Sequence, residues 1–267
     1  MCADSDRVAA RAIALLDTGI DAEAMPFATV LPGVNFSGEG RGDCTKDENG
    51  HGTAMAATIL HHAPHARIVP VKLMGQYGYP RMDDAIELAF DWIIGHRADS
   101  GIRVICAAIA DGSELMTDGQ HRGSVLHQYI AALRSREVAT VMPAGNRVDG
   151  DCQTNEQGMA WPAILREVVS VGALAREAGS LRLRADTRRL HRDYGTGCHT
   201  TIFAEPGEPG GTSGAAAVVA ACLGRLAAAH PEWTVDRLVG EASRGPITLD
   251  GEERLWPTLD YLVQERS

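Results

Sequence analysis

The sequence contains few aromatic residues and no long uninterrupted apolar stretch. Phenylalanine, tryptophan and tyrosine together make up 5% of the 267 residues, whereas glycine occurs 29 times. This balance favours an α/β core of small residues and tight turns over a β-sandwich. No segment approaches the ~18 consecutive apolar residues that a membrane span needs. The start of the chain also lacks the pattern of a secretion signal, so we expect a cytoplasmic protein that binds no membrane.

The chain also lacks a basic surplus. Its 25 lysine and arginine residues and 35 aspartate and glutamate residues give a formal net charge of −10. Nucleic acids bind to basic faces, so we expect no nucleic acid as a partner. Residues 176–192 are rich in arginine, but Glu177 and Asp186 interrupt them. Such a stretch is typical of a solvated surface loop or hairpin.

The six cysteines form no CxxC pair, which argues against a zinc ribbon or a small disulfide scaffold. Cys106 and Cys222 lie in apolar runs and are expected to be core thiols. Cys44, Cys152 and Cys198 lie in polar stretches, and a disulfide among them remains an open alternative.

Apolar runs of strand length alternate with helical patterns along the chain. Because these runs are apolar at nearly every position, we expect them to be buried on both faces, as in a parallel sheet. The predicted strands cover residues 12–16, 67–73, 104–109, 138–142 and 168–171, and the predicted helices cover residues 53–60, 83–96, 124–136 and 215–229. The alternation predicts one α/β domain over residues 1–267. It would be a doubly wound, mostly parallel sheet with helices on both faces and functional residues at the carboxyl ends of strands.

Four polar motifs with glycine follow predicted strands or open predicted helices. They are Asp17-Thr18-Gly19, Asn49-Gly50-His51-Gly52-Thr53, Ala144-Gly145-Asn146 and Gly211-Thr212-Ser213-Gly214-Ala215. Each motif alone is typical of a turn or a helix cap. In combination they place aspartate, histidine and serine in one of the known chain orders of a catalytic triad.

The segments around these residues resemble the subtilisin-like serine proteases, or subtilases. The matching segments are LLDTGID around Asp17, GHGTAMAATI around His51 and GTSGAAA around Ser213, and flanking similarity extends from about residue 11 to 245. The resemblance implies a serine endopeptidase. Ser213 would be the nucleophile and His51 the base, with Asp17 orienting the imidazole. The Ser213 N–H and the Asn146 amide would form the oxyanion hole.

The resemblance also implies a groove for an extended peptide or protein substrate. The residues expected to contact the substrate are Asn49, Ala108, Ile109, Ala110, Asp111, Ala144, Gly145 and Thr212. Ala110 replaces a glycine of the family, and we expect its methyl group to narrow the pocket for the side chain before the scissile bond. Asp111 and Arg147 carry opposite charges in this region. Either they pair with each other, or one of them selects a charged substrate side chain.

Other positions depart from the family pattern. Asp17 lies only 16 residues after Met1, so we expect no propeptide. The domain would fold unaided, or a partner protein or a removed segment would help it. We expect no required cofactor. Asp43, Asp47, Glu48, Asp149 and Asp151 carry the oxygen atoms that calcium prefers as ligands, but we interpret them as solvated loop acids. We interpret His61, His62 and His65 as an ordinary turn rather than a zinc site.

Two other functions fit the same motifs. A peptidyl ligase or macrocyclase of ribosomal peptides would form the same acyl-enzyme and resolve it with an amine instead of water. A non-catalytic relative would keep the groove and bind peptides only. We favour an intracellular endopeptidase with a narrow substrate range.

Overall fold

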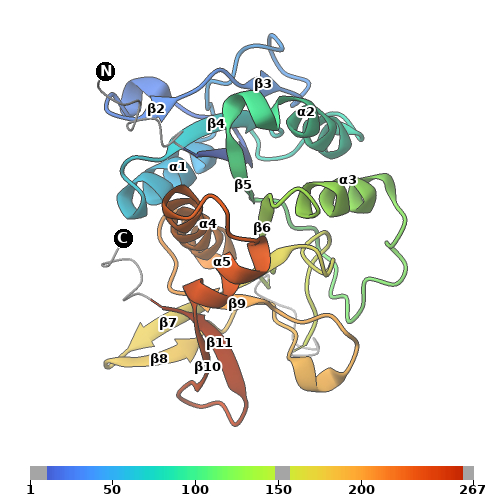
Figure 1. The fold of residues 1–267 in the computed structure, drawn as a ribbon, viewed down its shortest axis with the longest axis vertical. Helices are drawn as coiled ribbons and strands as arrows, with labels where there is room; N and C mark the ends of the chain where they lie inside the picture. The colour runs from blue at the N-terminus through green and yellow to red at the C-terminus, as the bar shows by residue number, and fades with distance from the viewer. Residues whose placement is uncertain (1–10, 148–156, 261–267) are drawn as a thin grey trace, which may run out of the picture.

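The computed structural model describes residues 11–147 and 157–260 (Figure 1). The strands in these residues are β1 (Ala12–Asp17), β2 (Thr29–Val30), β3 (Val34–Asn35), β4 (Arg67–Lys72), β5 (Ile102–Ala107), β6 (Ala139–Pro143), β7 (Val169–Glu177), β8 (Ser180–Leu183), β9 (Ile202–Ala204), β10 (Ser243–Thr248) and β11 (Leu255–Leu259). They form one sheet in the order β10-β11-β9-β7-β6-β5-β1-β4-β2, with β3 beside β4 and β8 beside β7. Within it only the pairs β7–β8 and β10–β11 are antiparallel. The predicted, mostly parallel sheet is therefore confirmed.

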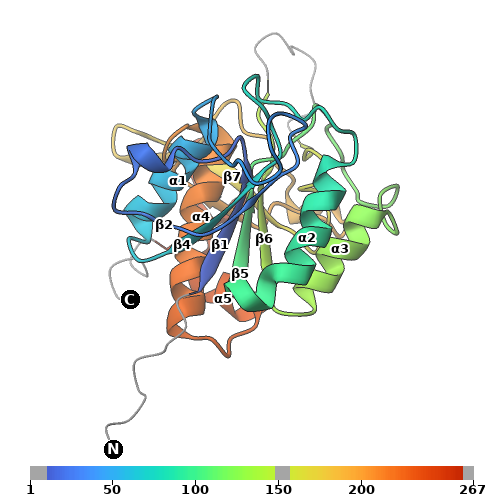
Figure 2. The same cartoon turned by 90° about the horizontal axis from the view of Figure 1, so that it is seen from above.

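The helices of the described residues are α1 (His51–His62), α2 (Ala85–Ser100), α3 (Val125–Arg134), α4 (Gly211–Ala229) and α5 (Val235–Ala242), with short 3-10 turns at Ala22–Ala24 and Arg192–Tyr194. Helices α1, α4 and α5 cover one face of the sheet, and α2 and α3 cover the other (Figure 2). Each face has its own buried apolar cluster, which is the arrangement of a doubly wound fold.

The predicted elements differ from the observed ones mainly at their ends. Strand β5 ends at Ala107 rather than at Ile109, because its pairing with β1 and β6 stops there. Strand β7 continues to Glu177, because its second half pairs with β8 as a hairpin. Helix α4 begins at Gly211, four residues before the predicted start at Ala215. Ser213 therefore lies inside the first turn of the helix instead of preceding it.

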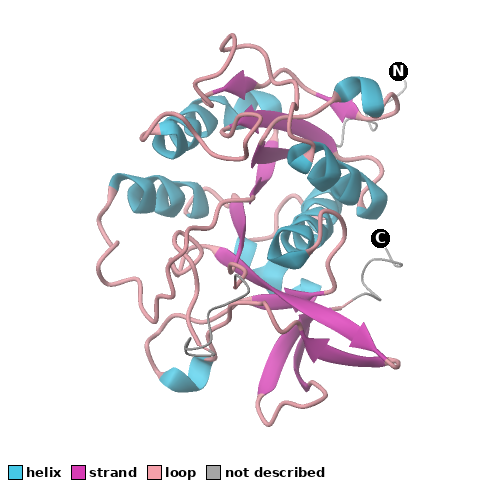
Figure 3. Ribbon diagram, turned by 180° about the vertical axis from the view of Figure 1, so that it is seen from behind, coloured by secondary structure: helices cyan, strands magenta, loops and turns pink. Residues whose placement is uncertain are grey.

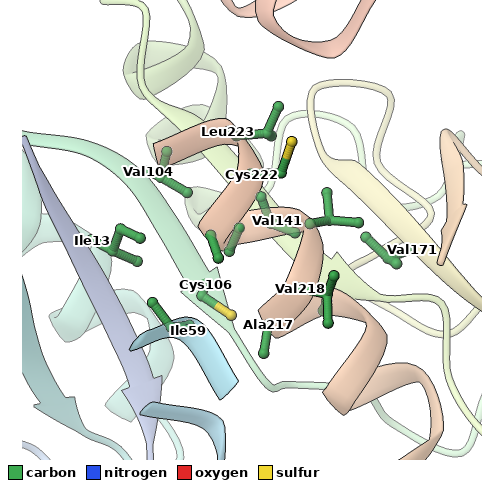
Figure 4. Close-up of a cluster of buried hydrophobic side chains, with 14 of the residues drawn as sticks. Ile13, Ile59, Val104, Cys106, Val141, Val171, Ala217, Val218, Cys222 and Leu223 are labelled. Atoms are coloured by element: carbon green, nitrogen blue, oxygen red, sulfur yellow. The ribbon is translucent and has the colours of Figure 1, made fainter. Parts of the chain in front are cut away.

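Helix α4 is the centre of the core. Small side chains such as Ala217 let the helix approach the sheet closely, and Val218 and Leu223 belong to the same buried cluster as Val141 of β6 (Figure 4). By length and composition α4 is the one helix of the described residues that is apolar enough to cross a membrane. Because 72% of that segment is buried inside the protein, it has the character of a core helix.

The arginine-rich stretch is only partly a surface feature. It begins at the tip of the β7–β8 hairpin, which extends beyond the helical layers in the lower part of Figure 3. Arg176 and Arg184 form ion pairs there with neighbouring acids. Arg188 and Arg189, however, are only 4% and 7% exposed, so the expectation of a wholly solvated stretch was wrong. The chain turns inward at this point because the Arg188 N–H donates to the Gly145 carbonyl at 2.9 Å.

The cysteines of the described residues are free thiols. Cys106 and Cys222 are buried as predicted, and burial raises the pKa of Cys222 to about 11 and that of Cys106 further above its ordinary value. Cys44 and Cys198 are not bonded to each other or to another cysteine, so the disulfide alternative is not realised at either. Cys152 lies outside the described residues.

Candidate active site

The four predicted catalytic side chains come from strand ends and helix starts at one edge of the sheet. Asp17 is the last residue of β1, and Asn146 follows β6. Both strands run parallel to β5 between them, so their carboxyl ends meet at the same edge. His51 is the first residue of α1, and Ser213 lies in the first turn of α4. These two helices pack against each other on one face of the sheet.

The buried carboxylate of Asp17 holds the ring of His51. The His51 Nδ1 atom lies 2.8 Å from Asp17 Oδ1 and 2.9 Å from Oδ2. Asp17 is only 1% exposed, and its Oδ1 also accepts the Thr18 N–H at 2.7 Å. A carboxylate at this distance fixes the tautomer with the proton on Nδ1 and leaves Nε2 as the acceptor. The pair can therefore work as a general base through Nε2.

The surroundings of His51 favour its protonated form. Burial alone would lower the pKa of His51, but the hydrogen bond and the charge of Asp17, followed by the charge of Asp47, raise it above its ordinary value of 6.5. The ring can thus gain a proton during a reaction and remain stabilised as a cation.

Helix α1 approaches β1 so closely that only glycine fits at one position. A Cβ atom on Gly52 would overlap the carbonyl oxygen of Gly19 and lie 3.2 Å from the Asp17 Cβ. The absence of a side chain at Gly52 therefore lets the start of α1 lie against the end of β1. This contact brings His51 within reach of Asp17.

Ser213 has a free hydroxyl group and a free backbone N–H. Gly210 precedes the helix as its N-cap and gives no side-chain hydrogen bond. Within residues 11–147 and 157–260, neither the Ser213 Oγ nor its N–H has a hydrogen-bond partner, and the Oγ is not bonded to His51. The first-turn N–H groups of a helix favour negative charge. The hydroxyl is thus available beside a donor suited to an oxyanion.

Asn146 is oriented by its neighbour in the serine motif. The Asn146 Oδ1 accepts the Thr212 N–H and the Thr212 hydroxyl, both at 3.0 Å. Its Nδ2 group has no hydrogen-bond partner among the described residues. Thr212 is fully buried, so its observed contact is with Asn146 and the expectation that it binds substrate is not supported. An amide held in this way presents its donor end for a ligand.

The predicted groove wall after β5 is open to solvent. Ala108 and Ile109 are half-buried and Ala110 is exposed, where the chain leaves the sheet. Asn49, also expected to contact the substrate, lies two residues before His51. Its Oδ1 accepts the His51 N–H at 3.2 Å and its Nδ2 donates to the Gln76 carbonyl at 2.9 Å. Asn49 thus ties the catalytic helix to a neighbouring loop.

Asp111 closes a turn rather than carrying a free charge. Its Oδ1 accepts the N–H groups of Ser113 at 2.9 Å and Trp161 at 3.0 Å. No ion pair joins it to Arg147 within the part of the chain that the structure describes. The pairing alternative is therefore not realised, and the carboxylate is used to hold the groove wall.

The opposite wall differs from the expectation. Ala144 is fully buried, its N–H donates to Val171, and its carbonyl accepts the Ala160 N–H, so it cannot line the groove as predicted. A Cβ on Gly145 would lie 2.9 Å from both the Ala160 Cβ and the Arg188 Cδ. These two side chains fill the space beside Gly145. Because Ala160 and Arg188 are 0% and 4% exposed, they leave no room for a side chain at Gly145 but do not themselves line the groove.

The acidic loop residues were expected to be solvated, and this holds for Asp43 and Glu48, whose side chains are 70% and 54% exposed. Asp43 pairs with Arg41 at the surface, and Glu48 lies 3.4 Å from the Lys72 Nζ. Asp47 is only 7% exposed, so its interpretation as a solvated acid was wrong. Asp149 and Asp151 lie outside the described residues. Among the described residues, no group of three or more histidines, cysteines or acids is placed to hold a metal ion.

A buried Asp–His pair and a helix-borne serine, on the carboxyl edge of a doubly wound sheet, define a class of proteins equipped for serine nucleophile chemistry. A comparison with known families places the chain within that class. The Peptidase_S8 model, described as the subtilase family, matches residues 10–240. The chain belongs to the subtilase family.

Curated proteins and solved structures give similar results. The chain is 31% identical over 174 residues to "Intracellular serine protease" of Paenibacillus polymyxa, and 29% identical over 175 residues to "Major intracellular serine protease" of Bacillus subtilis (strain 168). Each alignment covers 61% of this chain, but only 49% and 50% of the respective relative. The chain thus spans about half the length of the curated relatives it matches.

The solved structures agree in fold. "Sphericase" matches with a TM-score of 0.69 at 20% identity, over 87% of this chain and 82% of that one. "S41 Psychrophilic Protease" matches with a TM-score of 0.71 at 21% identity, over 88% of this chain and 82% of that one. The subtilisin-like fold is therefore shown on independent grounds.

Three residues of the site were missed by the sequence interpretation. Ala160 and Arg188 pack against the Ala144-Gly145 segment through long-range contacts that no local pattern indicates. Asp47 did carry a signal, because an acid shortly before an alanine-rich helix is a typical cap.

Proposed function

We propose that the protein is a serine endopeptidase that hydrolyses peptide bonds through an acyl-enzyme. The observation that carries the proposal is the buried Asp17–His51 pair, whose Nδ1–oxygen distances are 2.8 and 2.9 Å. It is supported by two free donors, the Ser213 N–H and the Asn146 Nδ2. Membership of the subtilase family and the printed names of the relatives agree with it.

In the first half of the reaction, the Ser213 oxygen attacks the carbonyl carbon of the scissile bond while His51 Nε2 takes the hydroxyl proton. Asp17 stabilises the imidazolium that forms. The carbonyl oxygen becomes negative and accepts hydrogen bonds from the Ser213 N–H and the Asn146 Nδ2. The intermediate then collapses. His51 gives its proton to the departing amine, and the acyl group stays on Ser213.

In the second half, His51 takes a proton from a water molecule, whose oxygen attacks the acyl carbon. The second tetrahedral intermediate uses the same two donors. Its collapse returns the proton to Ser213 and releases the new carboxyl end of the peptide. The chain's own residues supply the nucleophile, the base and the oxyanion donors, so we propose that no cofactor takes part.

We further propose that the protein acts inside the cell on a limited set of peptide or protein substrates. Two relatives of this chain are named intracellular serine proteases. The exposed methyl group of Ala110, just after β5, would restrict the side chains that the groove can accept.

A fluorophosphonate probe tests the proposal directly, because it reacts with serines that are activated by a base. We expect one labelled serine, located at Ser213 by peptide mass analysis, and no labelling of Ser213→Ala. Ser135→Ala is a matched control on an exposed helix end and should be labelled normally. Mass spectrometry of peptide products then distinguishes the alternatives. Two fragments whose summed mass exceeds that of the substrate by one water indicate hydrolysis, and a cyclic product indicates a ligase. Binding of the peptide without labelling of Ser213 by the probe indicates a non-catalytic groove.

A further inference from the structure

Asp47 is a second buried carboxylate beside the Asp17–His51 pair. It precedes α1 and is 7% exposed. Its Oδ1 accepts the N–H groups of Asn49 at 3.0 Å and Gly50 at 2.9 Å. Its Oδ2 accepts the N–H of Thr53 at 2.9 Å and the Thr53 hydroxyl at 2.6 Å. The carboxylate therefore holds the backbone on both sides of His51.

The same carboxylate reaches the segment that carries the triad aspartate. The Thr18 hydroxyl donates to Asp47 Oδ1 at 2.8 Å and accepts the Gly52 N–H at 2.9 Å. The Thr18 N–H in turn donates to Asp17 Oδ1 at 2.7 Å. Thr18 thus connects the end of β1 to the start of α1, and Asp47 fixes both ends of this connection.

The charges around this connection come from several elements. Burial alone would raise the pKa of Asp47, but hydrogen bonds from Thr53, Gly50 and Thr18 lower it, so the group is anionic at neutral pH. His51 therefore has two negative groups beside it, Asp17 from β1 and Asp47 from the loop before α1. Lys72, at the end of β4, donates to the Lys46 carbonyl at 2.7 Å in the same loop.

A cap for α1 alone would need only the bonds to the helix N-terminus. Asp47 also accepts the hydroxyl group of Thr18, and the Thr18 N–H donates to Asp17. Capping of α1 does not require this additional bond. We propose that Asp47 is a positioning residue of the active site, which sets the placement of His51 relative to Asp17 through Thr18 and the first turn of α1. This role rests on the proposed hydrolytic function, and Asp47 itself touches no substrate.

The first test compares Asp47→Asn with Glu48→Gln. Both remove one negative charge from neighbouring positions, but the Glu48 side chain is 54% exposed and makes only a 3.4 Å contact with Lys72. In Asp47→Asn the amide must turn an N–H toward a backbone donor, so the connection loosens. A shift of about 1 Å costs ~10²-fold in rate. We expect kcat to fall by on the order of tenfold to a hundredfold with KM little changed, and the acid limb of the pH profile to move to lower pH. Glu48→Gln should behave as wild type.

The second test keeps the bonds from Asp47 to the N-terminus of α1 and removes the Thr18 hydroxyl, which links Asp47 to the Gly52 N–H. Thr18→Val deletes the hydroxyl at nearly constant shape, and Thr18→Ser retains it. We expect kcat to fall in Thr18→Val and to be restored in Thr18→Ser. This pair decides the question if Asp47→Asn does not fold.

The outcomes separate the two proposals. If Asp47→Asn lowers the melting temperature but leaves kcat and the acid limb unchanged, Asp47 is only a helix cap and the inference is overturned. Equal kcat in Thr18→Val and Thr18→Ser would also overturn it. If instead the wild-type protein is not labelled at Ser213 by the fluorophosphonate probe, the proposed hydrolytic function fails first.

Discussion

The contact between Gly52 and the end of β1 gives a sharp test of the site geometry. In Gly52→Ala, the new Cβ would lie about 1 Å closer to the Gly19 carbonyl oxygen than an ordinary carbon–oxygen contact of ~3.3 Å allows. The obstacle is backbone, which cannot rotate away as a flexible side chain can. The start of α1 must therefore move by a comparable distance, and His51 moves with it.

The expected loss follows from that displacement. A misplacement of about 1 Å costs on the order of a hundredfold in rate, or ~2.7 kcal/mol in activation free energy. We expect kcat for a peptide substrate, and the rate of fluorophosphonate labelling of Ser213, to fall together by about this factor. KM should change little, because Gly52 is buried and has no side chain that could contact the substrate.

Gly95→Ala is the matched control. Gly95 lies in α2 on the other face of the sheet, and a Cβ there meets nothing within 4 Å. Alanine should stabilise that helix by ~0.5–1 kcal/mol and leave kcat unchanged. If Gly52→Ala folds and keeps a kcat within twofold of wild type, then close packing of α1 on β1 does not position His51 and the reasoning is refuted.

Three further outcomes are expected. Ser213→Ala should abolish turnover without lowering the melting temperature, and near-native activity in this variant would contradict a serine nucleophile. Only the neutral ring of His51 accepts the serine proton, and the pKa of His51 is raised above 6.5. We therefore expect kcat/KM to fall with decreasing pH, with the midpoint of the fall above pH 6.5. A flat profile from pH 5 to 8 would exclude His51 as the base. Peptides that differ only before the scissile bond should be cleaved best with alanine or leucine there and poorly with phenylalanine, by one to two powers of ten, since overfilling costs ~1–3 kcal/mol. Ala110→Gly should improve cleavage of the phenylalanine peptide, and phenylalanine as the best residue in wild type would refute the narrowing.

Local patterns in the sequence were sufficient for the parts of the protein that neighbouring residues determine. The apolar run before Asp17 predicted β1 almost to the residue, because a strand buried on both faces has no alternative pattern. The order of Asp17, His51 and Ser213 indicated the site. The start of α4 was placed too late, because Gly211 and Thr212 have low helix propensity and the packing of the helix overrides it.

The features that were missed depend on contacts between distant segments. Arg188 appeared to be one of several surface arginines, yet its guanidinium donates to the carbonyl groups of Asp111 and Ser113, 77 and 75 positions earlier. Ala144 appeared to line the groove because it stands next to Asn146, but strand β7 and Ala160 take up both of its backbone groups. Neither contact leaves a periodic signal, since each depends on how the chain returns to the sheet.

The alanine-rich helix α4 has a consequence for how this protein can change over generations. The nucleophile is carried on the first turn of a helix whose remaining turns are the centre of the core, where Ala217 and Val218 are 0% and 1% exposed. A larger residue at Ala217 would push the helix from the sheet and carry Ser213 with it. Mutations that repack this core are therefore tested by selection for activity as well as for stability. Adaptation to new substrates is expected to occur in the exposed loops around the groove, while α4 stays nearly constant.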